Sequence, residues 1–178
     1  ARTVRRKVQA LRAFFRYMMR VHGMGDNPAA ELAVPRQKRQ LPVYVRQEET
    51  MAMIDAMESR AESGDFTDLR NALILDMFYS TGLRCSELTG LKDADVDTVK
   101  GELKVLGKRN KERIVPFGTE LSDLIDDYRR VREATAGPRC EPFFVRPSGE
   151  PLYRKLVYNI VHRAMEENVH ASRMSPHV

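Results

Sequence analysis

Thiols, tryptophan and long apolar runs are scarce or absent in this chain. Its 178 residues include two cysteines, Cys85 and Cys140, and no tryptophan. Two thiols in a chain of this size argue against a disulfide framework and favour a reducing, cytoplasmic compartment. No apolar run approaches the roughly 18 residues that span a bilayer, so we expect no membrane segment. The first residues lack the apolar block of a secretory signal, and the start at Ala1 suggests an excised piece.

Basic residues outnumber acidic ones, 30 to 25, giving a formal net charge of +5. The basic residues cluster along the chain, which indicates a polyanionic partner. An anionic membrane surface fits less well, because no segment combines a basic helix face with a strongly exposed apolar face that includes tryptophan. The length and the 42% hydrophobic content suffice for one full core, or for one domain and a piece of another.

The first 34 residues are predicted to be helical but too few to form a core alone. Residues 2–22 carry an apolar stripe at helical spacing, and Asn27-Pro28 is typical of the start of a second, short helix that ends before Pro35. Residues 35–46 are basic and bounded by prolines, which predicts a linker. Residues 47–178 are then a separate domain.

This second part is predicted to be mixed and mainly α-helical, with a small antiparallel sheet. Apolar residues at helical spacing predict helices over residues 47–61, 66–80, 119–136 and 153–168. Alternation predicts two strands, 102–106 and 113–115, joined by a polar loop, and residues 143–145 are a candidate third strand.

The segment from Ser80 to Leu91 places an arginine directly after a forced helix break. Gly82 can end the preceding helix in a left-handed conformation, and a short helix is predicted from Arg84 onward. A guanidinium beside exposed N–H groups at a helix start suits a phosphate. Glu87, one turn on, could fix that guanidinium's orientation. The alternative is an ordinary Arg–Glu pair on a surface helix.

Four cations gather at the predicted hairpin tip: Lys108, Arg109, Lys111 and Arg113. A tip of this kind could lie along nucleic-acid phosphates. Most lysines in such a loop are simply solvated. A catalytic lysine requires its ammonium beside a leaving oxygen and a proton affinity lowered by neighbouring positive charge.

Three segments in order resemble the tyrosine recombinases, specifically the Xer-like integrases. They are Thr81-Gly-Leu-Arg84-Cys-Ser-Glu87-Leu, Gly107-Lys108-Arg-Asn-Lys-Glu-Arg-Ile-Val-Pro, and Ser175-Pro-His177-Val. The segments around Arg12 and Asn27 are similar to the closing helices of that family's core-binding domain. The resemblance implies a helical catalytic domain with a small antiparallel sheet over residues 47–178, preceded by the last helices of an all-α core-binding domain over 1–34.

The resemblance also implies roles for individual residues. Arg84 matches the first phosphate-binding arginine, Glu87 its acidic support, Lys108 the lysine that protonates the departing 5′-oxygen, and His177 the first histidine. The family's chemistry uses no metal or cofactor: a tyrosine attacks the scissile phosphate and forms a 3′-phosphotyrosyl link. The partner is double-stranded DNA, and the parent protein is a homotetramer or heterotetramer on paired sites. The candidate DNA-binding residues are Arg5, Arg12, Arg16, Lys38, Arg39, Arg109, Lys111 and Arg113.

The family pattern continues after the histidine with a second arginine and then the tyrosine nucleophile, whereas this sequence stops at Val178. All six tyrosines precede His177, and none matches the nucleophile: Tyr17, Tyr44, Tyr79, Tyr128, Tyr153 and Tyr158. We therefore expect a catalytic domain truncated at its C-terminus, a recombinase fragment that binds DNA but does not cleave it. The alternative is a non-catalytic DNA-binding module that grips backbone phosphates.

Metal sites fit the sequence poorly. Asp93, Asp95 and Asp97 alternate like the start of a calcium loop, but Thr98 and Lys104 occupy the positions that need glycine and glutamate. His162, Glu166 and His170 fall on successive helical turns, where a solvated face is the better interpretation. We predict no metal.

Overall fold

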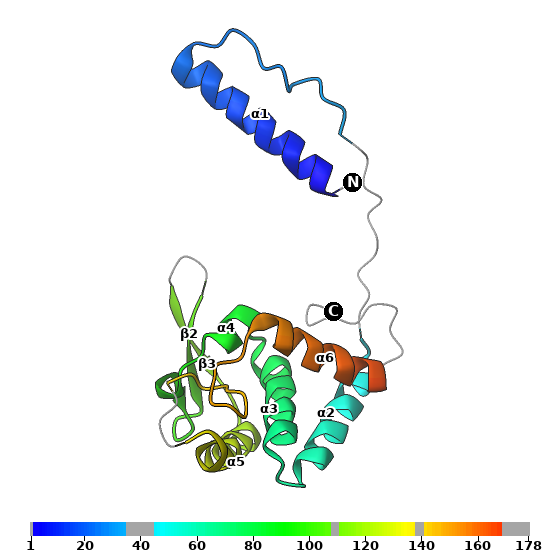
Figure 1. Ribbon diagram of the computed structural model, residues 1–178, viewed down its shortest axis with the longest axis vertical. Coiled ribbons are helices and arrows are strands. Elements are labelled where there is room, and N and C mark those ends of the chain that lie inside the picture. The colour runs from blue at the N-terminus through cyan, green and yellow to red at the C-terminus, as the bar shows by residue number, and fades with distance from the viewer. Residues whose placement is uncertain (1, 35–44, 108–110, 138–140, 169–178) are drawn as a thin grey trace. The chain divides into compact units, whose positions relative to one another are not determined.

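The computed structural model describes residues 2–34, 45–107, 111–137 and 141–168. The chain divides into two compact units, Ala1–Pro42 and Val43–Val178, and each is considered by itself (Figure 1). Most of the predicted linker, residues 35–44, lies outside the described residues.

The first unit contains one helix followed by a turn. Helix α1 spans Arg2–His22, as predicted. The second helix expected after Asn27 is wrong, because residues 28–31 form a turn. The Asn27 side chain does cap this turn, accepting a hydrogen bond from the Ala29 N–H at 3.0 Å. The Arg12 guanidinium donates to the carbonyls of Ala29, Ala30 and Leu32 at 2.9–3.0 Å, which occupies acceptors that a continuing helix would use.

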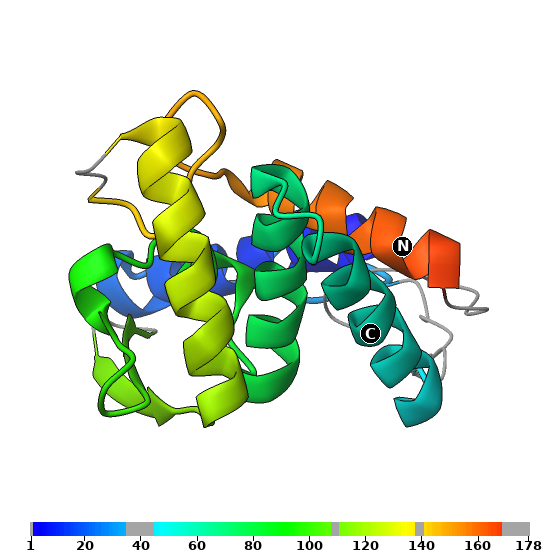
Figure 2. The same cartoon turned by 90° about the horizontal axis from the view of Figure 1, so that it is seen from below.

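The second unit is built around helix α3, Phe66–Thr81, which packs against the three other long helices. These are α2 (Gln47–Ala61), α5 (Thr119–Ala136) and α6 (Arg154–Asn168). Figure 2 shows α3 between α5 and α2. Leu73, Ile74 and Met77 of α3 are fully buried, so this helix forms the centre of the core. All four long helices were predicted. Within the described residues, none of the helices has the length and apolarity that crossing a membrane requires.

A three-stranded antiparallel sheet covers one end of this core. Its strands are β1 (Val96–Asp97), β2 (Glu102–Leu106) and β3 (Glu112–Pro116), in that spatial order. The one-turn helix η1, Asp93–Asp95, precedes them. The register places Val105 opposite Arg113. The β2–β3 hairpin was predicted.

The expected third strand at residues 143–145 is wrong, and β1 takes its place in the sheet. Val145 makes only an isolated bridge with Pro151 in the described structure. The Phe143 N–H donates to the Leu91 carbonyl at 2.9 Å, and the Val145 N–H donates to the Tyr128 hydroxyl at 3.1 Å. Because a loop and a side chain satisfy these groups, the segment has no need of a strand partner.

Two caps fix where α3 starts and ends, and therefore where the next segment lies. Asp65 accepts hydrogen bonds from the N–H groups of Thr67 and Asp68 at 2.8 and 3.1 Å. Gly82 ends the helix at φ 61°, as predicted, a conformation that glycine adopts without steric penalty. Helix α4, Cys85–Thr89, follows immediately and is shorter than expected.

Candidate functional site

Arg84 sits at the corner between α3 and α4, in extended conformation directly before the first residue of α4. Glu87 lies one turn along, and its Oε2 accepts a hydrogen bond from the Arg84 backbone N–H at 2.8 Å. Its Oε1 accepts another from Arg84 Nη1 at 2.9 Å. The predicted contact between the two side chains is therefore present. The Glu87 side chain is 4% exposed and that of Arg84 65%, so the acid is buried and the cation faces solvent.

Arg113, on strand β3, makes the strongest contact with the same carboxylate. Its Nη1 lies 2.7 Å from Glu87 Oε1, and its Nη2 lies 2.9 Å from Oε2. This bidentate geometry matches the planar guanidinium to both carboxylate oxygens. Glu87 thus joins the helix corner to the hairpin, although the two arginines are distant in sequence.

Sequence reasoning treated Arg113 as a tip cation and missed its contact with Glu87. The signal that could have revealed it is the strand alternation. Arg113 lies opposite Val105, which is 2% exposed, so its side chain starts on the covered face of the hairpin. A charge on that face needs a buried partner of opposite sign.

The charge state of this cluster follows from its hydrogen bonds. Those from Arg113 are the largest cause that lowers the pKa of Glu87 from 4.5 to about 2. The Arg84 backbone and side chain lower it further, while burial opposes them. Pairing with Glu87 raises the pKa of Arg113. At neutral pH two guanidinium ions share one carboxylate, which leaves one net positive charge.

The end of the hairpin stem lies against this cluster, and Figure 1 shows α4 beside β2 and β3. The Gly107 N–H donates to the Lys111 carbonyl at 2.7 Å. A Cβ added at Gly107 would lie 3.3 Å from Arg113 Nη1 and 3.9 Å from Glu87 Oε1. Glycine therefore allows the stem to approach Arg113 closely. Lys108 follows Gly107 in sequence and lies outside the described residues.

The remaining candidate residues divide into three groups. His177, Lys38, Arg39 and Arg109 lie outside the described residues together with Lys108. Arg5, Arg16 and Lys111 are exposed, the first two on α1. Arg12 differs from these, because its guanidinium donates to the carbonyls of Ala29 and Ala30 in the turn at residues 28–31 and of Leu32 directly after it.

Other potential chemistry is weaker in the described part of the chain, which holds no group of three His, Cys, Asp or Glu side chains suited to a metal ion. His162 Nδ1 lies 3.4 Å from Glu166 Oε1 as an isolated pair, and His170 lies outside the described residues. Burial raises the pKa of Cys85, which argues against a reactive thiolate.

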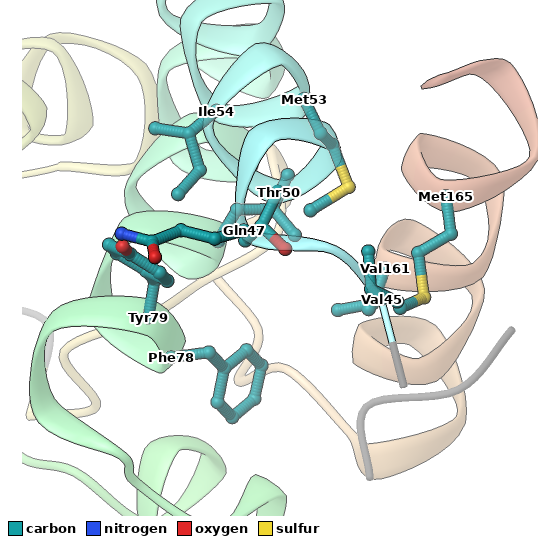
Figure 3. Close-up of a pocket in the computed structure, with 10 residues that line it drawn as sticks. Val45, Gln47, Thr50, Met53, Ile54, Phe78, Tyr79, Val161 and Met165 are labelled. Atoms are coloured by element: carbon teal, nitrogen blue, oxygen red, sulfur yellow. The ribbon is translucent and has the colours of Figure 1, made fainter. Parts of the chain in front are cut away.

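An apolar cavity of about 440 Å³ lies among α2, α3 and α6 (Figure 3). Val45, Met53, Val161 and Met165 line it, and Tyr79 is the one acid–base group among the side chains drawn there. Gln47, Thr50 and Tyr79 also line it, so the cavity combines apolar walls with a few uncharged polar groups, and its lining within the described residues includes no basic side chain.

The sequence profile of the phage integrase family matches residues 44–178. The chain belongs to this family. Its sequence is 36% identical over 172 residues to a tyrosine recombinase XerC of Pelobacter propionicus, covering 97% of this chain and 55% of that protein. A tyrosine recombinase XerC of Mycobacterium bovis is 36% identical over 180 residues, covering 98% and 59%. These matches confirm the resemblance to Xer-like tyrosine recombinases. The chain spans less than two thirds of the length of these relatives.

Solved structures of the same kind share the fold. The crystal structure of XerA recombinase matches with a TM-score of 0.66 at 23% identity, covering 96% of this chain and 56% of that one. A XerH site-specific recombinase bound to difH substrate matches with a TM-score of 0.68 at 20% identity, covering 92% and 47%. A lambda integrase tetramer bound to a Holliday junction gives 0.66 at 18% identity, covering 98% and 49%. The mainly helical unit with a small antiparallel sheet is thus the tyrosine recombinase catalytic fold.

Proposed function

We propose that this chain is part of a site-specific DNA recombinase that cleaves and rejoins DNA through a 3′-phosphotyrosyl intermediate. The observation that carries the proposal is the Arg84 guanidinium, held at a helix corner by a buried carboxylate and exposed over 65% of its side chain. A fixed, solvent-facing guanidinium next to a basic hairpin suits a DNA backbone phosphate.

In the proposed reaction Arg84 binds nonbridging oxygens of the scissile phosphate and stabilises the charge that develops there. Glu87 holds Arg84 in place. Lys108 protonates the departing 5′-oxygen, and His177 contacts a nonbridging oxygen or assists proton transfer. The tyrosines of this chain all precede His177, so we propose that the 178 residues alone bind DNA without forming a covalent adduct.

We further propose that residues 1–34 belong to a DNA-clamping core-binding domain, 35–46 to a linker and 47–178 to the catalytic domain. The exposed cations Arg5, Arg16 and Lys111 would grip backbone phosphates, as would Lys38, Arg39 and Arg109. The partner is double-stranded DNA. The similar structures include a recombinase bound to its DNA substrate and an integrase tetramer bound to a Holliday junction, which supports a tetrameric parent on paired sites.

The first test measures the affinity of the chain for a short duplex by fluorescence anisotropy over a range of salt concentrations. Arg84→Ala should weaken binding roughly tenfold or more and reduce the salt slope by about 1, because one phosphate contact is lost. Arg130→Ala is the matched control: Arg130 is 75% exposed and also pairs with an acid three residues away, Asp127. Equal losses in the two variants would contradict the proposal.

The second test separates the recombinase from a non-catalytic DNA-binding module, the other function that an exposed phosphate-binding cation would serve. A longer chain that continues beyond Val178 is incubated with nicked suicide duplexes carrying sites selected from a random pool. A covalent protein–DNA adduct that Arg84→Ala abolishes supports the recombinase. Tight binding with no adduct at any selected site supports the module.

A further inference from the structure

Arg113 is placed to act on Arg84 rather than on DNA. We propose that it is a positioning residue: by occupying both oxygens of Glu87, it leaves the Arg84 guanidinium turned outward and able to bind a phosphate. This inference rests on the proposed function and deepens it, since it assigns a role that the hairpin motif alone does not.

The hydrogen bonds around Glu87 are divided unequally. Arg113 donates one nitrogen to each carboxylate oxygen, at 2.7 and 2.9 Å. The Arg84 side chain donates only Nη1, at 2.9 Å, and its Nε and Nη2 have no hydrogen-bond partner among the described residues. A guanidinium has five N–H donors, so most of those on Arg84 stay available to an incoming anion.

Without Arg113, the same carboxylate would attract Arg84 alone. Arg84 Nη1 already donates to Glu87 Oε1, and with Arg113 absent the planar fork favours a second side-chain hydrogen bond, to Oε2. That arrangement would draw the guanidinium inward and cancel its charge. With Arg113 present the cluster keeps one net positive charge, and the positive end faces solvent.

Arg113 itself is poorly placed to contact DNA directly. Its side chain is 38% exposed, compared with 65% for Arg84. It begins opposite the buried Val105, and it would have to break both hydrogen bonds with Glu87 to reach an external phosphate. Glu87 is 4% exposed and would then be left with less of the compensation that its burial requires.

The test is a double-mutant cycle on binding of the 178-residue chain to a short duplex, with circular dichroism to establish that each variant is folded. Arg113→Gln removes the charge and the fork, and we expect it to weaken binding ~10-fold and to lower the salt slope by about 1. In an Arg84→Ala background the same change should alter affinity less than ~2-fold, because Arg84 is the group through which Arg113 acts.

A rescue experiment sharpens this cycle. If Arg113→Gln acts by leaving the Glu87 charge free to capture Arg84, adding Glu87→Gln should restore most of the lost affinity and slope. A merely structural role for Arg113 predicts a further loss instead. Should Arg113→Gln fail to fold, Arg113→Lys enters the same cycle: a loss that disappears with Arg84→Ala supports the inference, and an undiminished loss contradicts it.

The outcomes separate this inference from the proposed function. If Arg84→Ala changes neither affinity nor slope, the proposed function fails and the inference falls with it. If Arg84→Ala weakens binding but Arg113→Gln costs the same factor in both backgrounds, Arg113 contacts DNA directly and only the inference is wrong.

Discussion

Two clusters in the second unit each place two arginines on one carboxylate, but with opposite sides buried. In the first, Glu87 is 4% exposed and Arg84 65%. In the second, Arg132 Nη2 lies 2.9 Å from Asp93 Oδ1, with Arg132 4% exposed and Asp93 37%. The third member, Arg129, places Nε 3.2 Å from the same Asp93 oxygen. The first cluster exposes the cation Arg84 to solvent, whereas the second buries the cation Arg132.

The partners of the arginines explain the difference. Arg132 Nη1 donates to the Phe143 carbonyl at 3.0 Å, and Arg129 Nη2 donates to the Val96 carbonyl at 2.8 Å. Both guanidinium groups also lie over the Phe143 ring. These contacts join helix α5 to η1, to strand β1 and to the segment around Phe143, so they hold the fold together. Two arginines on one carboxylate can therefore hold the fold together or present a cation to solvent, depending on which side chains are buried.

The largest effect on stability should come from the buried arginine. Arg132→Met removes a buried cation that bonds Asp93 and the Phe143 carbonyl, and we expect it to lower the free energy of unfolding by about 3 kcal/mol in urea titrations. The Arg130 side chain, two residues earlier, is 75% exposed, and Arg130→Met should lower the free energy of unfolding by less than about 0.5 kcal/mol. A smaller loss for Arg132→Met than for Arg130→Met would remove the contrast between the clusters.

The contribution of the buried Glu87 carboxylate to the free energy of unfolding should depend on pH. The pKa of Glu87 falls from 4.5 to about 2 on folding, so its contribution is complete above pH 4.5 and is lost as the pH falls toward 2. The shift corresponds to about 3 kcal/mol. Urea titrations of wild type and Glu87→Gln should therefore differ at pH 7 and converge toward pH 2. A difference in unfolding free energy between wild type and Glu87→Gln that stays constant with pH would show that the charge of Glu87 does not contribute.

A smaller effect is expected where the hairpin stem approaches the cluster. Gly107→Ala would place a Cβ 3.2 Å from the Lys111 carbonyl oxygen and 3.3 Å from Arg113 Nη1, which requires a local shift. We expect a loss of about 1 kcal/mol in unfolding free energy. Gly25→Ala, with no atom within 4 Å, is the control and should be nearly neutral. Equal free energies of unfolding for Gly107→Ala and Gly25→Ala would show that the stem accommodates the added methyl group without cost.

The smallest effect on stability should come from Arg84 itself. Its side chain is 65% exposed, and the Arg113 hydrogen bonds to Glu87 remain when it is removed. We expect Arg84→Ala to lower the unfolding free energy by less than about 1 kcal/mol. Thermal unfolding of wild type, Arg84→Ala and Arg132→Met, measured in parallel, tests this expectation. A loss as large as that of Arg132→Met would make Arg84 a structural residue.

Local features of this fold could be predicted from sequence, because the signals lie within a few residues of one another. The cap at Asp65, the left-handed Gly82 and the Arg84–Glu87 spacing are all of this kind. The two strands of the β2–β3 hairpin could be predicted for the same reason.

Long-range contacts account for what could not be predicted. The turn after Asn27 depends on Arg12, at least 17 residues earlier, which occupies the carbonyls of the turn. The partner of Arg113 lies 26 residues away on another element. Likewise, residues 143–145 favour a strand by composition, but Tyr128 and Leu91 satisfy their backbone groups instead. Strand alternation can place Arg113 on the covered face of the hairpin, but it does not identify Glu87 as the partner.

The proposed binding of a single backbone phosphate by the Arg84 guanidinium can be tested by a methylphosphonate scan of the duplex. Each phosphate of a selected duplex is replaced in turn by the neutral methylphosphonate, and the affinities of wild type and Arg84→Ala are compared. We predict that one position, or two adjacent ones, costs the wild type ~10-fold and costs Arg84→Ala almost nothing. Identical scans for the two proteins would contradict the claim.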